Sequence, residues 1–139
     1  MITLLKKSSD PITNHYKKGK VIALNKHAND DVILLIEGTA INCFASYCPY
    51  TIEIGETYDI ELTLNLSDDY EIERVEPRKI LVEKANYGYC YFLYGELLNE
   101  TFLTFTSLSD EDIHYEHPEC NEHFIKLKVQ RIDASFRRA

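Results

Sequence analysis

The chain has 139 residues, with 23 acidic and 15 basic side chains and a formal net charge of −8. A chain of this length buries enough apolar surface to fold as one domain without a disulfide or a metal. A net negative protein repels phosphate backbones, which disfavours nonspecific nucleic-acid binding, and it favours a partner that is basic. The N-terminal apolar run is too short for a signal peptide, and no stretch is long enough for a membrane helix, so we expect a cytosolic protein.

The N-terminal half predicts short strands. Residues 1–19 are interpreted as a strand followed by a polar arm, and residues 25–31 as a turn. Residues 32–36 are continuously apolar and β-branched, which is typical of a strand buried on both faces. A second strand is expected over residues 41–47. Four cysteines (Cys43, Cys48, Cys90 and Cys120) would remain reduced in the cytosol, and we interpret them mainly as small buried hydrophobic residues.

The clearest pattern covers residues 57–66, where apolar and polar side chains alternate strictly. The apolar members are Tyr58, Ile60, Leu62, Leu64 and Leu66. This period of two predicts a half-buried strand. The Ser67–Tyr70 sequence is a turn signal, so we expect a hairpin in which Leu66 pairs with Ile72.

The C-terminal half continues the β pattern. Residues 87–98 are apolar on both faces and predict a central strand, which turns at Asn99 and Glu100 into a strand over residues 101–107. Residues 109–123 are polar and allow one short helical turn with Ser109 as its N-cap. The last strand is expected over residues 124–132, and residues 134–139 are expected to fray as a basic tail.

These elements predict a single all-β domain over residues 1–139 that is mainly antiparallel. Seven to nine short strands with one or two helical turns are typical of a small barrel or sandwich, OB-like or SH3-like in the broad sense. Strand edges left open by such a fold would also allow a homodimer.

No glycine-rich phosphate loop, HExxH or GxSxG motif is present, so we expect a protein that is not an enzyme. The most specific local pattern places His, His, Cys and His at intervals of three. These residues are His114, His117, Cys120 and His123. Imidazole and thiolate groups are natural ligands of zinc, so a small metal-binding domain is one hypothesis. The alternative is a polar surface loop that happens to be rich in histidine.

Two further groups of residues are candidates for partner binding. Tyr87, Tyr89 and Tyr91 alternate along one predicted strand and so share a face, either as a binding platform or as part of the core. Carboxylates gather on the outward side of two strands that we expect to be neighbours and in the turn between them. They are Asp59, Glu61, Asp68, Asp69, Glu71 and Glu73. They form either a solvated face that protects the sheet from aggregation or a surface for a cationic partner.

The leading hypothesis combines the net charge, the acidic face and the missing catalytic motifs. It describes an inhibitor of the bacterial immunity type that occludes a basic protein such as a toxin nuclease. The alternative is an OB-like binder of single-stranded nucleic acid or another ligand, with the three tyrosines as a stacking platform. In that case basic residues near the C-terminus would contact phosphates. They are Lys126, Lys128, Arg131, Arg137 and Arg138.

Overall fold

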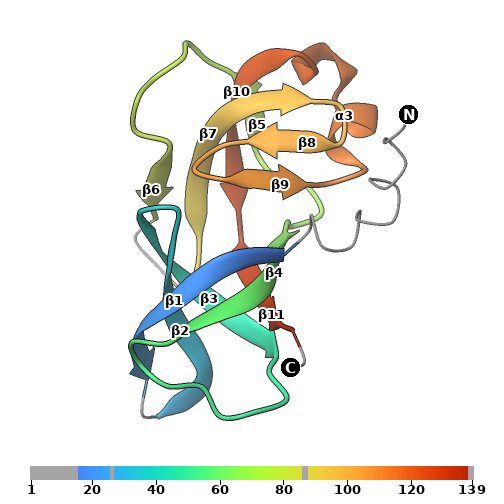
Figure 1. Ribbon diagram of the computed structural model, residues 1–139. Helices are drawn as coiled ribbons and strands as arrows, with labels where there is room; N and C mark the ends of the chain where they lie inside the picture. The colour runs from blue at the N-terminus through green and yellow to red at the C-terminus, as the bar shows by residue number, and fades with distance from the viewer. Residues whose placement is uncertain (1–15, 26, 86–87, 138–139) are drawn as a thin grey trace, which may run out of the picture.

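The computed structural model describes residues 16–25, 27–85 and 88–137, and strands dominate it, as the predicted all-β class requires (Figure 1). Two sheets are present within these residues. The first closes into a barrel built from five strands: β1 (Tyr16–Asn25), β2 (Ala28–Ile36), β3 (Thr39–Tyr47), β4 (Thr57–Asn65) and β11 (Arg131–Phe136).

The order around the barrel is β1-β2-β3-β11-β4, and β4 closes the ring by pairing with β1. The β3–β11 pair is parallel, and the other four pairs are antiparallel. Counted along the chain, the barrel strands therefore follow the order first, second, third, fifth, fourth. This is the Greek-key order of an OB barrel, and it confirms the predicted small barrel.

The connection between β4 and β11, which are the fourth and fifth barrel strands, holds the second sheet. Its order is β5-β10-β7-β8-β9, and β6 also pairs with β7. The strands are β5 (Ile72–Arg74), β6 (Val82–Lys84), β7 (Tyr91–Leu98), β8 (Thr101–Leu103), β9 (Ser107–Ser109) and β10 (His123–Val129). Figure 1 shows this sheet above the barrel, with β10 leading down into β11.

The alternation predicted over residues 57–66 is confirmed, because Ile60, Leu62 and Leu64 are buried in the barrel. In β2 the residues Val32, Leu34 and Ile36 are buried, but the intervening residues are only half-buried. The expectation that this segment is buried on both faces is therefore wrong, because alternate side chains of β2 point away from the barrel interior. Most of the buried side chains of both sheets belong to one hydrophobic cluster.

Hydrogen bonds join the two sheets near the β2–β3 turn. The backbone N–H of Asn42 donates to the hydroxyl of Tyr91 across 2.8 Å. At the tip of the turn, the hydroxyl of Thr106 donates to the carboxylate of Glu37 across 2.5 Å. Glu37 and Gly38 both have positive φ, as a tight two-residue hairpin turn requires.

Several expected boundaries in the N-terminal half differ from the structure. Residues 16–19 belong to β1 and not to an arm, and residues 28–31 belong to β2 and not to a turn. The hairpin expected after β4 is wrong, because β5 pairs with β10, and Ile72 lies opposite Leu127. Local turn signals could not reveal this long-range partner. Residues 1–15, which include most of the predicted arm, lie outside the described residues.

The C-terminal half shows four further differences. The strand expected over residues 101–107 is two short strands, β8 and β9, with residues 104–106 between them. The strand expected over residues 124–132 is divided at Gln130 between the two sheets. The helical turn α3 (Ile113–Glu116) has Asp112 as its N-cap in place of Ser109, and η1 (Pro118–Cys120) follows it. The predicted tail begins too early, because Ala134 and Phe136 are buried in β11. Among the described residues, no helix has the length and apolarity needed to cross a membrane.

Candidate functional site

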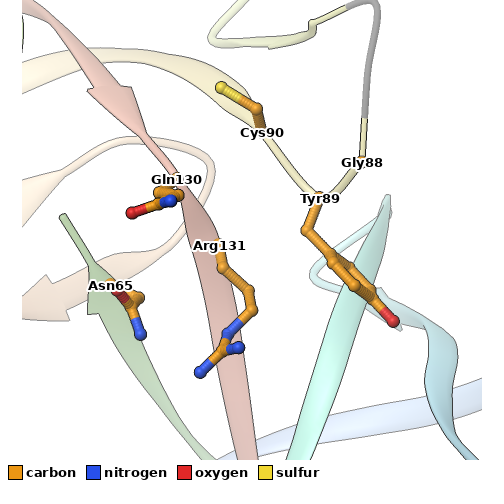
Figure 2. Close-up of a pocket in the computed structure, with 6 residues that line it drawn as sticks. All are labelled: Asn65, Gly88, Tyr89, Cys90, Gln130 and Arg131. Carbon is orange, nitrogen blue, oxygen red and sulfur yellow. The ribbon is translucent and has the colours of Figure 1, made fainter. Parts of the chain in front are cut away.

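A cleft of about 360 Å³ lies where the second sheet joins the barrel. It is lined by Asn65, Gly88, Tyr89, Cys90, Gln130 and Arg131 (Figure 2). Asn65 ends β4, Arg131 begins β11, and the other four residues come from the long connection between these two strands. OB barrels bind ligands on the face of their second and third strands and beside the connection between their fourth and fifth strands. The cleft adjoins this connection.

Arg131 and Tyr89, which line the cleft, both contact the ring of Phe44 on β3. The guanidinium carbon of Arg131 lies 4.1 Å from the ring centroid of Phe44. Tyr89 meets the same ring edge to face, with centroids 6.1 Å apart and an interplanar angle of 84°. Phe44 and Tyr89 are each half-buried, so part of both rings remains accessible. Because Arg131 already lies over Phe44, Tyr89 is the ring that the cleft offers as a stacking surface for a flat ligand group.

Asp133 holds the guanidinium in place through two hydrogen bonds. Arg131 Nε donates to Asp133 Oδ1 across 2.6 Å, and Arg131 Nη2 donates to Asp133 Oδ2 across 3.3 Å. Figure 2 shows the Arg131 side chain extending between Asn65 and Tyr89, with Cys90 pointing the opposite way. The remaining guanidinium N–H groups are therefore positioned to donate to a ligand.

The electrostatic surroundings of Tyr89 are mixed. Burial raises the pKa of the Tyr89 phenol, and the nearby carboxylates of Asp31 and Asp30 raise it further, while Arg131 lowers it. The phenol is thus protonated at neutral pH and can donate a hydrogen bond. Because Asp133 neutralises Arg131, the cleft itself is not strongly basic. Stacking and hydrogen bonding, more than charge, would determine its affinity.

The three tyrosines predicted as a binding platform do not share one face in the structure. Tyr87 lies outside the described residues. Tyr91 is only 3% exposed, and its hydroxyl accepts the Asn42 N–H, so it is a core residue that connects the two sheets. Of the two tyrosines that the structure describes, Tyr89 lines the cleft and Tyr91 does not. The change occurs because the regular β7 strand starts only at Tyr91, so the alternation does not extend back to Tyr89.

The predicted acidic face is not one surface. Asp59 and Glu61 lie on β4 of the barrel, whereas Glu71 and Glu73 lie at β5 beside β10. Asp59 and Glu71 also meet cations, since Asp59 Oδ1 is 2.6 Å from Lys18 Nζ and Glu71 Oε2 is 3.4 Å from Lys128 Nζ.

Asp68 and Asp69 lie in the exposed turn after β4, and Tyr70, which follows them directly, contacts a different acidic group. Tyr70 donates a hydrogen bond to Glu116 Oε1 of α3 across 2.7 Å. Burial raises the pKa of the Tyr70 phenol, and so do Glu116, Asp110 and Asp112. The turn therefore packs beside the acidic residues around α3, which contains the 76% exposed Tyr115.

The histidine and cysteine pattern does not form a metal centre. Within residues 16–25, 27–85 and 88–137, no three His, Cys, Asp or Glu side chains are placed to hold a metal ion. Cys120 is buried in η1, His123 is exposed on β10, and His117 packs against Tyr70 with ring centroids 5.3 Å apart. The interval of three does not place the side chains together because Pro118 ends α3 and the chain changes direction.

Sequence reasoning did not single out Asn65 and Gln130 of the cleft, nor Phe44 beside it. Phe44 carried a usable signal, because it alternates with the buried residues Ile41 and Cys43 and so presents a large aromatic ring to the outside of its strand. The two amides carried none, since their proximity depends on the β4–β11 pairing.

Comparisons with known proteins identify a family but no characterised relative. Neither a search of curated proteins nor a search of solved structures returned a match. Residues 15–137 match the family described as "Uncharacterised conserved protein UCP019853". The match covers the barrel and the second sheet, and the chain therefore belongs to this family.

Proposed function

We propose that the protein is a non-enzymatic OB-type binding module whose ligand is single-stranded nucleic acid, bound at the cleft beside Tyr89. The observation that carries this proposal is the position of the cleft, which adjoins the connection between the fourth and fifth strands of a barrel with OB strand order. Tyr89 offers a stacking surface for a base there, and Phe44 packs against Tyr89 from β3. Every base has a π-face, so this recognition tolerates different sequences.

The polar groups of the cleft suit the edges of the same bases. Asn65 and Gln130 each provide an amide that can donate and accept, and Arg131 adds donors held in place by Asp133. The net charge of −8 opposes a polyanion, so we expect modest affinity at physiological salt. The proposed location remains the cytosol.

The test is fluorescence anisotropy with labelled single-stranded and double-stranded oligonucleotides at low salt. We expect preferential binding of the single strand. Tyr89→Ala should weaken that binding by roughly tenfold, because one base–aromatic stack contributes about 1–3 kcal/mol and 1.4 kcal/mol corresponds to a factor of ten. Tyr115→Ala is the matched control, since it removes a tyrosine that is 76% exposed on α3. If the unaltered protein binds no oligonucleotide, the proposal is refuted.

A basic protein partner is the second proposal. The observation that favours it is the group of carboxylates around Tyr70 and α3, with Tyr115 exposed among them. An exposed tyrosine beside carboxylates suits Lys and Arg side chains of a partner, as an inhibitor of a basic toxin would require.

The second proposal is tested by affinity capture from the source cell with the unaltered protein and with a Tyr115→Ala, Asp69→Asn double variant. Retention of one basic protein by the unaltered chain and its loss from the variant is the expected result. Equal retention by both would contradict a role for this surface.

A further inference from the structure

We infer that the bound strand does not end at the cleft but continues over the outer face of the second sheet, along β7 and β10. This inference rests on the proposed function, and it adds a second contact region on the inserted sheet. The region is defined by Phe92, Tyr94, Lys126 and Lys128, and we call it the β7–β10 track.

The track is contiguous with the cleft through the chain itself. β10 passes into β11 through Gln130, which lines the cleft, and Arg131 follows directly. On the neighbouring strand, Cys90 of the cleft directly precedes β7. The distance along the strand from Lys126 to Arg131 is about 17 Å at the usual rise per residue. A ligand that fills the cleft therefore has a direct path onto β7 and β10.

Register places aromatic and cationic side chains next to each other along this path. Lys126 lies opposite Tyr94, and Lys128 lies opposite Phe92. The outward direction of Lys126 and Lys128 follows from the alternation, because Ile125, Leu127 and Val129 of β10 are buried, and Phe92 and Tyr94 share their face by register. β7 and β10 are paired from Tyr91 opposite Val129 to Leu97 opposite His123 (Figure 1).

The distances show that the cations lie over the rings. Lys126 Nζ is 4.6 Å from the centroid of Phe92 and 6.0 Å from that of Tyr94, and Lys128 Nζ is 6.0 Å from that of Phe92. Phe92 is half-buried, whereas Tyr94 is 4% exposed beneath the guanidinium of Arg78 at 3.8 Å. Phe92 is thus the more accessible of the two rings, and a base that stacks on it would move Lys126 from the ring toward a phosphate.

Carboxylates on the same face limit the strength of this contact. Glu71 Oε2 is 3.4 Å from Lys128 Nζ, Glu73 lies opposite Lys126 in the register, and Glu83 lies opposite Phe92. A phosphate must therefore compete with protein carboxylates for the lysines. The direction of the change in affinity therefore distinguishes nucleic acid from a basic protein. Neutralising Glu73 should strengthen binding of nucleic acid and weaken binding of a cationic protein.

The experiment compares fluorescein-labelled oligothymidylates of three and nine nucleotides by anisotropy over a range of salt concentrations. The unaltered protein should bind the longer strand about tenfold more tightly, because OB sites extend over ~4–16 nucleotides. Lys126→Gln should weaken binding of the longer strand several-fold and reduce the salt slope by about 0.7, with no change for the shorter strand. Phe92→Leu should reduce the length preference while retaining apolar bulk, and Glu73→Gln should strengthen binding of the longer strand.

Lys18→Gln is the charge-matched control, because Lys18 is paired with Asp59 on barrel strands away from β10. Two results would refute binding along the β7–β10 track while leaving the proposed binding at the cleft: equal affinity for both oligonucleotides, or a Lys126→Gln variant that behaves like Lys18→Gln. Failure of the unaltered protein to bind either strand would instead overturn the proposed function. Thermal melting of each variant verifies that it is folded.

Discussion

Tyr91 connects the barrel to the second sheet, and the Tyr91→Phe variant tests how much that connection contributes to stability. The phenol is 3% exposed and accepts the backbone N–H of Asn42 across 2.8 Å. β11 pairs with β3 only from Phe44 onward, so Asn42 lies before the start of this pairing. Tyr91, and not β11, therefore accepts the hydrogen bond from the Asn42 N–H. Phenylalanine keeps the ring and removes the acceptor.

The expected cost follows from leaving a partly buried donor unsatisfied, which is about 1–3 kcal/mol. This corresponds to a roughly 5- to 150-fold change in the unfolding equilibrium, since 1.4 kcal/mol is a factor of ten. Urea titration followed by circular dichroism measures it from the shift in midpoint at constant slope. Tyr115→Phe is the control, and we expect no measurable change because that side chain is 76% exposed.

Two results would refute the reasoning. A Tyr91→Phe variant as stable as the control would show that the Asn42 N–H is satisfied in another way. A large change in the urea slope, in place of the midpoint, would show that the two sheets had stopped unfolding together. The second result would also indicate that the cleft between them depends on this hydrogen bond.

Further predictions concern the packing and the ionisation of the core. Gly95→Ala should destabilise by about 1–3 kcal/mol, because a Cβ there would lie 2.1 Å from the backbone oxygen of Leu103; an unchanged urea midpoint would contradict this. Burial raises the pKa of the Cys43 thiol from 9.0 to about 12, and Asp133 contributes to the rise. Below pH 9 the thiol is neutral in both states, and above it the unfolded thiol ionises first, so stability should fall by about 1.4 kcal/mol per pH unit between pH 9 and 12. Urea midpoints of Cys43→Ala should show a shallower dependence on pH over that range, and equal slopes would refute the assignment.

The amino-acid sequence by itself determined the all-β class and several of the strands. The alternation over residues 57–66 sets which side chains of β4 enter the core, because a strand repeats every two residues whatever its partners are. The short helical turn between residues 109 and 123 was likewise predictable, since Pro118 limits it locally. These features depend on neighbours in the chain and can therefore be read from it.

Strand pairing was decided only by the tertiary structure. Ile72 pairs with β10 although the turn at residues 67–70 favoured a hairpin with Leu66, because the buried contact with a strand far along the chain prevails over the local signal. The cleft depends on the same long-range pairing. Asn65, Tyr89 and Arg131 are distant in sequence and meet because β4 pairs with β11 and the second sheet folds back between them, which no local pattern encodes.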